Sequence, residues 1–493
     1  MIATPDIDRS ASALAQLAGG RDVRNEYDAT VTTTRRRAPR QILRSEDNEL
    51  KPRDRKKLVA TTRDVRRNFA IARWMIGKHL DYVTRFRFQP ATGIPAVDEQ
   101  LELLMRIRSR PQNCDVAGRH PLSRMIRLAE ACRCVDGDMV FNKLSSGRLQ
   151  AIEGDRIRTP NRNLPRDFDA AQWTHGVKTS KPSGRALEYA ICNRKGTGFE
   201  LAKTVPAKYI IHHAFWDRFD QVRGISPIAS GLNELQDTRE AFAFALARLK
   251  IGQLFGLVTK REASEAMGEV TAAGSDDATG TTTTTDETEE SQQFEVEFGR
   301  GPFHLDIDRE DGAEFLQDKN PSTEFDQFTS KIIMVALKSL DLPYSFYDES
   351  FTNFYGSRAA LMQYLQSCET KRDDVRAVLD QITLWWVMLW IADGDLKLPV
   401  GMSLVDVKWE WIHAGIPWWD PSKDIRGDMM AVAAGWKTND DVCKERTGRR
   451  FRDNIDQLAA EQDYIRQSGA MIVAPDSGVF NPEPVIAGDS NDA

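Results

Sequence analysis

The 493-residue chain has few cysteines, and none of them are paired at the spacing of a metal site. Only six occur: Cys114, Cys132, Cys134, Cys192, Cys368 and Cys443. The two nearest, Cys132 and Cys134, form a Cys-x-Cys. Disulfide-stapled folds and structural zinc sites need more closely grouped ligands. The spacing therefore predicts a reduced, intracellular chain with free thiols and no bound metal.

Long apolar runs are also missing. The N-terminal stretch MIATPDIDRSASALAQLAGG contains no apolar core of a signal peptide. The most apolar run, LWWVMLWIA at 384–392, is shorter than the roughly 20 residues of a membrane-spanning helix. It predicts a buried helix segment, and we expect no membrane partner.

Motifs for nucleotide chemistry are absent as well. A phosphate-binding loop requires Gly-x-x-x-x-Gly-Lys-Ser/Thr, and the nearest strings, Gly77–Lys78 and Gly435–Thr438, do not fit it. The pair Asp306 and Asp308 could suggest a metal-dependent nuclease, but alternating acidic and apolar residues are typical of an exposed strand. The chain is therefore expected to be non-enzymatic and to use no cofactor.

The tripeptide Gly224-Ile225-Ser226 resembles half of a nucleophile elbow, whose full pattern is Gly-x-Ser-x-Gly. The second half does not fit, because Ile228 takes the place of the glycine and Pro227 has no N–H for an oxyanion hole. Serine is a strong N-cap and proline is favoured at the first helical position. Ser226 and Pro227 therefore predict the start of a helix.

The formal net charge of −6 is modest for this length and does not favour a protein that coats nucleic acid generally. Residues 31–70 differ from the rest, with thirteen Lys or Arg against five acidic residues. Such a run could contact nucleic acid or an acidic partner surface, or it could be a solvated arm that leads into a helix. The sequence does not favour one of these over the other.

An α+β fold is predicted, with strands concentrated between residues 137 and 225. Turn residues there separate short apolar runs: MVFNKL, LQAIEG, LEYAICN, FELAKTV and KYIIHHAF. The last run contains His212 and His213, whose side chains should point to opposite faces of the strand and so cannot easily share a metal. Their predicted role is structural.

Helices dominate the rest of the chain. The main helical patterns cover 61–80, parts of 95–130, 226–251, 322–340, 358–392 and 450–467. Thr438, with Asp441 three residues later and Gly448 as a stop, predicts a further short helix. The helices 226–251 and 322–340 bracket a segment with strand patterns and an acidic, low-complexity stretch that is expected to be an exposed loop.

Three segments resemble the lambda-type family of portal proteins of tailed bacteriophages, in the same order and at similar spacing. They are VPAKYIIHHAFWDRFDQVRGISPIASGLNELQD, LDLPYSFYDESFTNFYGSRAALMQY and AGIPWWDPSKDIRGDMMAVAAGWKTNDDVCKERTGRRFRDNIDQLAAEQ. The likeness covers roughly residues 60–470. The chain departs from the family pattern at Phe219 and Asp220, where a proline is usual, and in the Thr/Asp/Glu insertion at 275–290.

The resemblance implies the portal fold: a β-rich wing, two stem helices around a small α/β clip, a long tunnel helix and a helical crown, assembled as a ring. By similarity the parts are: a basic flexible arm 1–60, wing 61–225, stem helix 226–251, clip 252–320 with the acidic loop 275–290, stem helix 321–340, tunnel loop 341–357, tunnel helix and second wing part 358–424, crown 425–475, and a disordered tail 476–493.

The candidate functional residues follow from the same likeness. The tunnel loop supplies possible DNA-facing residues: Tyr344, Phe346, Tyr347, Asp348, Glu349, Phe351, Asn353, Phe354 and Tyr355. Aromatic rings can stack on exposed bases, but duplex DNA offers no open base faces along its side, so packing is favoured for most of these rings. The acidic loop supplies candidates for docking a motor or adaptor: Asp286, Glu287, Glu289 and Glu290.

The predicted function is a dodecameric portal at one capsid vertex, a conduit for DNA packaging and ejection. The implied partners are further copies of the chain, double-stranded DNA, the large terminase subunit, a head–tail adaptor, and the major capsid and scaffold proteins, with assembly in the host cytoplasm. Two other classes remain open. One is a nucleic-acid-processing enzyme of a phage or mobile element, and the other is a capsid or scaffold component without a channel.

Overall fold

The computed structural model describes residues 45–160, 169–196, 198–254, 323–348, 354–415 and 420–469. The α-helices there are α2 (Glu46–Glu49), α3 (Pro52–Asn68), α4 (Ala70–Val83), α5 (Pro95–Arg108), α6 (Pro111–Cys114), α7 (Leu122–Asp136), α8 (Leu232–Leu254), α9 (Thr323–Leu337), α10 (Phe354–Asp393), α11 (Pro421–Ala433), α12 (Asn439–Thr447) and α13 (Phe451–Ser468). The strands are β1 (Phe86–Pro90), β2 (Asp138–Lys143), β3 (Leu149–Glu153), β4 (Trp173–Thr174), β5 (Val177–Thr179), β6 (Ala186–Lys195), β7 (Gly198–Pro206), β8 (Ile210–Ala214) and β9 (Trp409–His413).

The strands of the described residues form antiparallel sheets in the orders β3-β2-β8, β4-β5-β6-β7 and β1-β9. The five predicted strand runs between 137 and 225 are found as β2, β3, β6, β7 and β8. The pairing of β1 with β9 was not predicted, because Phe86 and His413 are far apart in the sequence and meet only in the fold. This mixture of helix and sheet agrees with the predicted α+β class.

The central strand β2 separates two hydrophobic cores. Val140 faces the smaller core, which β3, β8 and the four-stranded sheet complete. Phe141 faces the larger core, which α4, α5, α7 and α10 surround. Successive side chains of a strand alternate between its two faces, so a strand that is buried on both sides carries a continuous apolar run, as MVF at 139–141 does here.

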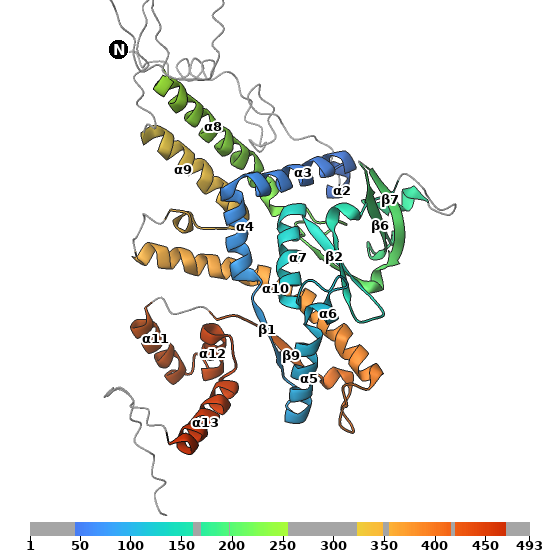
Figure 1. Cartoon of the computed structure of the whole chain (residues 1–493), viewed down its shortest axis with the longest axis vertical. Coiled ribbons are helices and arrows are strands. Elements are labelled where there is room, and N and C mark those ends of the chain that lie inside the picture. The colour runs from blue at the N-terminus through green and yellow to red at the C-terminus, as the bar shows by residue number, and fades with distance from the viewer. Residues whose placement is uncertain are drawn as a thin grey trace, which may run out of the picture.

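The helix predicted over 61–80 is two helices, α3 and α4, that change direction at Phe69 (Figure 1). Phe69 has an extended backbone, with φ −123° and ψ 114°, and its side chain packs against the larger core. The break allows Met75 and His79 of α4 to face that core, while α3 lies across the top of α7. Periodicity alone did not show the break, because apolar spacing continues through it.

The long helix predicted at 358–392 is α10, which begins four residues earlier at Phe354 and ends at Asp393. Part of α10 is long and apolar enough for a membrane span by length and composition alone. Its indole side chains Trp386 and Trp390 are nevertheless completely enclosed by the larger core. The segment is therefore a core helix that is buried along one face, while Leu384 and Met388 on its other side are 41% and 43% exposed.

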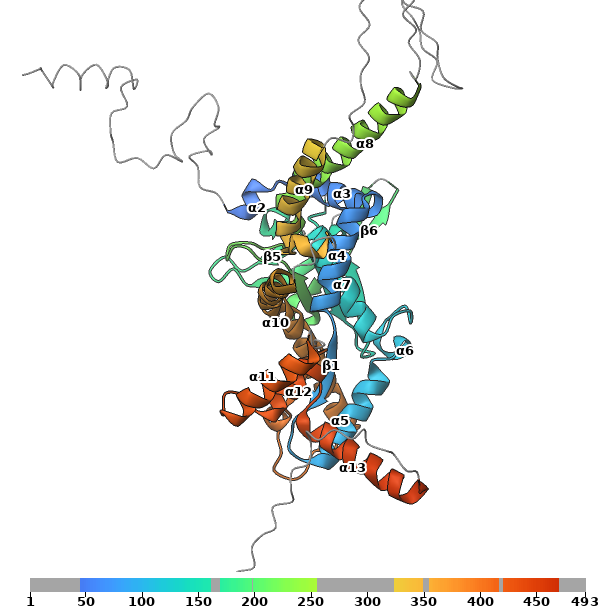
Figure 2. The same ribbon diagram turned by 90° about the vertical axis from the view of Figure 1, so that its left-hand side faces the viewer.

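Helices α8 and α9 lie side by side and project away from the body of the molecule (Figures 1 and 2). Gly231 lies against Ala336, and Phe242 packs edge-on against Phe325 at a ring distance of 6.4 Å. One helix therefore runs outward and the other returns. Residues 255–322 connect them and lie outside the described residues, so the predicted clip and its acidic loop are not described.

Several predicted boundaries fall inside helices and are corrected here. The end of the arm at residue 60 lies within α3, the end of the first stem helix at 251 within α8, the end of the tunnel loop at 357 within α10, and the start of the crown at 425 within α11. Residues 45–60 are also not a free arm, because Arg55 donates a hydrogen bond to the Gly224 carbonyl at 2.7 Å and the Asp47 carboxylate accepts one from the Val222 N–H at 2.8 Å.

The C-terminal helices α11 to α13 form a separate group beyond the β1-β9 ribbon (Figures 1 and 2). The capping box predicted at Thr438 and Asp441 is present, and Gly448 ends α12 in the left-handed region at φ 67°. The final predicted helix is found as α13. The predicted tail 476–493 lies outside the described residues.

Candidate functional site

The segment Gln221–Ser226 joins the β-rich body to the projecting helices. The Ser226 side chain is buried, accepts a hydrogen bond from the Ile228 N–H at 3.3 Å and donates one to the Cys134 carbonyl at 2.6 Å. Ser226 thus caps a short 3₁₀ turn, Pro227–Gly231, that leads into α8. The predicted helix start is confirmed, with the correction that its first turn is 3₁₀, and the serine is used as a cap.

Asp138 is the centre of the polar network at this junction. Its fully buried carboxylate accepts two hydrogen bonds from the Arg223 guanidinium, at 2.5 and 2.7 Å, and one from the backbone N–H of Gly224 at 3.2 Å. His212 Nε2 lies 3.2 Å from the same carboxylate and Arg55 lies 3.3 Å from it. Burial would raise the pKa of Asp138, but Arg223 and Arg55 hold it well below its usual range.

The rest of the Arg223 guanidinium is also satisfied. It donates to the carbonyls of Gly154, Ile157 and His175 at 2.7, 2.5 and 2.8 Å. A guanidinium has five N–H donors in a rigid fork, and here they connect the junction to β2, to the turn after β3 and to the turn before β5. The arrangement fixes where the projecting helices leave the body.

Glu130 on α7 is the centre of a second buried network. Its oxygens lie 2.8 Å from His79 Nε2, 2.7 Å from His213 Nε2 and 2.9 Å from Arg133 Nε. Arg133 also contacts Asp374 of α10 at 2.7 Å. The network therefore connects α4, α7, β8 and α10. Burial would raise the pKa of Glu130, but Arg133 and the two histidines hold it well below its usual range.

His79, Glu130 and Cys134 lie close enough together to suggest a metal site. Burial raises the pKa of the Cys134 thiol well above its usual value. The oxygens of Glu130 already accept hydrogen bonds from His79, His213 and Arg133, which a metal ion would have to displace. This group is a hydrogen-bonded cluster that holds elements together.

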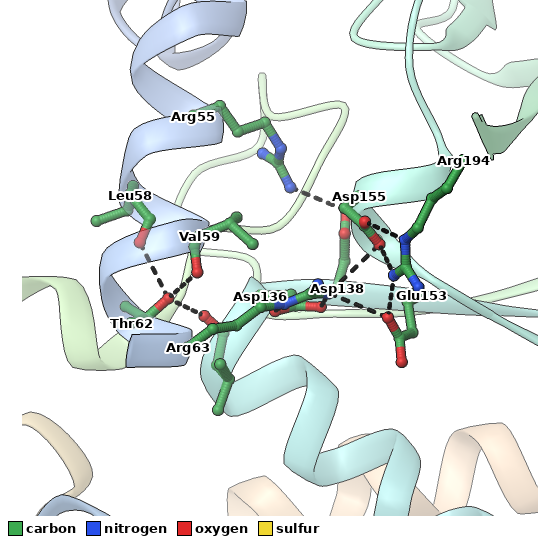
Figure 3. Close-up of polar contacts among 12 residues, drawn as sticks. Arg55, Leu58, Val59, Thr62, Arg63, Asp136, Asp138, Glu153, Asp155 and Arg194 are labelled. Atoms are coloured by element: carbon green, nitrogen blue, oxygen red, sulfur yellow. Dashed lines mark hydrogen bonds and ion pairs between the residues drawn. The ribbon is translucent and has the colours of Figure 1, made fainter. Parts of the chain in front are cut away.

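A third acidic cluster lies where α3 meets the sheet and is partly exposed (Figure 3). Asp136, Glu153 and Asp155 converge there, a set of oxygens that could suit a divalent cation. Two guanidinium groups fill the space between them. Arg63 of α3 binds Asp136 at 2.7 Å and Arg194 of β6 binds Asp155 at 2.9 Å. The cluster links α3 to the β3-β2-β8 sheet and to the β4-β5-β6-β7 sheet.

Three rings of the predicted tunnel loop pack inward. Phe346 stacks on Tyr82 at 5.8 Å and meets Tyr364 edge-on at 5.4 Å, and Tyr347 meets Trp74 at 5.9 Å. Tyr344 contacts Tyr347 at 5.8 Å in a 3₁₀ turn, Tyr344–Phe346. Packing was the role favoured from the sequence, and it is confirmed for these three rings.

The remaining predicted site residues are less fully described. Asp348 lies two residues after the 3₁₀ turn, where its N–H donates to the Tyr344 carbonyl at 3.0 Å, and Phe354 and Tyr355 open α10. Outside the described residues lie Glu349, Phe351 and Asn353 of the loop and the acidic candidates Asp286, Glu287, Glu289 and Glu290.

Sequence reasoning missed both buried carboxylates. A signal was present in LAEACRCVDGDMVF, where Glu130 and Asp138 stand among small and apolar residues. Glu130 lies four residues after Ile126 and four before Cys134, which places it on the buried face of α7. An acid at such a position must find cationic or hydrogen-bonding partners, but only the fold shows that Arg133 and the two histidines provide them.

Comparisons with known proteins give one family model and several similar solved structures. A family model described as phage portal protein, lambda family, matches residues 32–372, more than half of the chain. A structure titled as the virion of a native gene transfer agent particle aligns with a TM-score of 0.42 and 14% identity, over 80% of this chain and 92% of that one. The neck of a native particle of this kind, computed with C12 symmetry, gives 0.41 and 13%, over 80% and 92%. No curated protein sequence matches the chain.

Proposed function

The chain belongs to the lambda family of phage portal proteins, and we propose that twelve copies of it form a ring through which double-stranded DNA enters and leaves a capsid. The ring would occupy one vertex of the particle after assembly in the host cytoplasm. The observation that carries this proposal is the projecting pair α8 and α9, which exposes large apolar side chains on both helices.

The exposed side chains of the pair need a cover. Phe244 is 72% exposed and Phe328 is 60% exposed. Leu246 and Val335 are also exposed on the two helices. A helix that is apolar on more than one face is stable when other helices surround it. In a ring, the stem helices of adjacent copies provide such a surface, and every contact joins the same two different patches, one from each neighbour.

The parts outside this pair take roles within the same proposal. The clip 252–320 would meet the large terminase subunit during packaging and the head–tail adaptor afterwards. The acidic candidates Asp286, Glu287, Glu289 and Glu290 would face basic groups of these partners. The helices α11 to α13 would form the crown on the inner side of the capsid. The body around β2 would be the wing, which the major capsid and scaffold proteins would contact.

The tunnel loop is assigned to the DNA path, with a narrower set of candidates than the sequence indicated. The side chains of Tyr344 and Tyr347 pack against each other and those of Phe346 and Tyr347 pack against α4, so we assign all three to holding the loop in place. Asp348 and residues 349–355 remain as the candidates to approach DNA. Acidic groups there would repel phosphates and favour passage over retention.

Electron microscopy and native mass spectrometry of the purified chain test the ring. Particles with a central hole, at about twelve times 55.7 kDa, are the expected result. Phe244→Asp combined with Phe328→Asp should reduce the assembly to small species, because it puts charges into the proposed contact. Val400→Asp, at a fully exposed side chain on the body, is the matched control and should leave the ring intact.

If the parent chain is a monomer and the double variant has the same mass, the result would count against the ring and would support one of the other two classes. An enzyme would show metal- or ATP-dependent action on DNA in the same preparation. A capsid component without a channel would show neither that action nor a central hole.

A further inference from the structure

A basic groove of about 630 Å³ lies between the α3–α4 bend and α7. Its walls carry arginines and no lysine: Arg63, Arg66, Arg67, Arg73, Arg124 and Arg127. Two carboxylates, Asp136 and Glu153, also line it. The groove therefore has an excess of positive charge, although the chain as a whole is acidic.

Two of these arginines already have partners. Arg63 binds Asp136 and Asp155 (Figure 3), and Arg127 binds Asp81 at 2.9 Å. The other four, Arg66, Arg67, Arg73 and Arg124, have no carboxylate within ion-pair distance in the described part of the chain. Like charges around one groove repel each other, so an anionic ligand would be stabilised there.

Arginine is the residue best suited to anions that present two oxygens side by side. Its guanidinium forms paired hydrogen bonds with a carboxylate or a phosphate, in a geometry that lysine cannot reproduce. Both a protein segment rich in Asp or Glu and a nucleic-acid backbone would meet this requirement. The floor of the groove decides between them.

The floor is apolar. Ile76 and Leu80 of α4 and Ala131 and Val135 of α7 form its base and are almost completely buried, and Leu128 and Cys132 of α7 are half-buried beside them. The phosphate backbone of a duplex presents no apolar group to such a floor, whereas a protein helix with acids flanking leucine-like side chains fits both the floor and the walls. The floor thiol, Cys132, adds no reactivity, because burial raises its pKa to about 12.

We propose that this groove binds an acidic, amphipathic segment of a partner protein, with carboxylates on the arginine walls and apolar side chains on the floor between α4 and α7. Space for such a segment exists at Gly77, where a Cβ atom would have no neighbour within 4 Å. The inference goes beyond the ring and the DNA path, and it does not depend on either.

The test is fluorescence anisotropy with a fluorescein-labelled peptide of about 20 residues in which Glu and Leu recur at helical spacing. We expect saturable binding that weakens with added salt. The same peptide with Gln in place of Glu should bind at least tenfold more weakly. The triple variant Arg66→Gln, Arg73→Gln, Arg124→Gln should reduce binding of the Glu peptide at least tenfold.

Matched variants separate charge from damage to the fold. Arg452→Gln on α13, an exposed arginine outside the groove, should leave binding unchanged. Gly77→Asp should weaken binding and Gly77→Ala should not, because only the first adds a negative charge. Thermal unfolding of the triple variant should match the parent or exceed it, since the three arginines repel each other and make no described ion pair.

Three results would overturn the proposal. The first is equal binding of the Glu and Gln peptides. The second is peptide binding that the triple variant leaves unchanged. The third is a DNA duplex that competes for the same arginines and binds more tightly than the peptide, which would assign the groove to nucleic acid. These measurements do not require the ring, because the groove lies within a single chain, so they also test the proposal if the parent chain does not assemble.

Discussion

His212 and His213 are adjacent on β8 and bind two different buried carboxylates. His212 Nε2 lies 3.2 Å from Asp138, on the side of the junction, and His213 Nε2 lies 2.7 Å from Glu130, on the side of the larger core. The alternation of side chains along a strand produces this separation. One short strand therefore connects both polar networks, and each network fixes a different group of helices.

Loss of the Asp138 charge should destabilise the fold strongly. Asp138→Asn leaves the fully buried guanidinium of Arg223 without its counter-charge, and breaking a buried pair in this way costs about 3–5 kcal/mol. Urea unfolding of the parent and the variant measures the difference. The matched control is Glu153→Gln, in a half-exposed pair with Arg194, which should cost less than about 1 kcal/mol. Equal costs would contradict the central place given to Asp138.

The unfolding free energy should fall as the pH drops from about 7.5 to about 5.5. Burial lowers the pKa of His79 and of His212, so each ring takes up a proton at a lower pH in the fold than in the unfolded chain, whose histidines titrate at about pH 6.5. The unfolded state then binds more protons, and stability decreases as the pH falls. His79 Nδ1 has no hydrogen-bond partner among the described residues, which agrees with a neutral ring.

The double variant His79→Gln, His212→Gln should show a smaller decline over the same pH range, whatever its absolute stability. Below about pH 4.5 a further loss should follow in both proteins. Glu130 and Asp138, whose pKa values are held low in the fold, then become protonated in the unfolded chain first. An equal decline in parent and variant between about pH 7.5 and 5.5 would assign the effect to other groups.

A side chain at Gly231 should push the projecting helices apart. A Cβ atom there would lie 3.1 Å from the Ala336 carbonyl oxygen, so the larger Gly231→Val change cannot fit without movement. We expect a loss of about 1–3 kcal/mol in unfolding free energy. Gly427→Ala in α11 is the control, because nothing lies within 4 Å of its Cβ position, and it should be neutral or stabilising by up to about 1 kcal/mol.

Phe346 should matter for stability more than an exposed apolar neighbour of similar size. Phe346→Ala removes the contacts with Tyr82 and Tyr364, and a half-buried ring of this kind should contribute about 2 kcal/mol. Met362→Ala, at a side chain 62% exposed on α10, should change stability by less than about 0.5 kcal/mol. If the two variants have the same unfolding free energy, the contacts of the Phe346 side chain with Tyr82 and Tyr364 do not stabilise the fold.

Local patterns in the sequence were sufficient for many elements. The strands from 137 to 225, the caps at Ser226 and Thr438 and the long helix α10 depend on neighbours within a few residues, so their signals are visible in the chain itself. The break at Phe69 was missed, because the apolar period continues across it and only packing of the ring against the core favours the bend. The docking of residues 45–60 was missed for a similar reason, since Arg55 finds its partner 169 residues away.

Taken alone, the sequence determined the class of fold, the order of helices and strands, and the resemblance to lambda-type portal proteins, because these rest on local periodicity, capping and short motifs. Only the tertiary structure decided which charges are buried and which are free. Glu130 and Asp138 are satisfied by groups from several distant elements, while Arg66, Arg73 and Arg124 come together around one groove. Electrostatic energies depend on distance and burial in three dimensions, and neither can be read from positions along a chain.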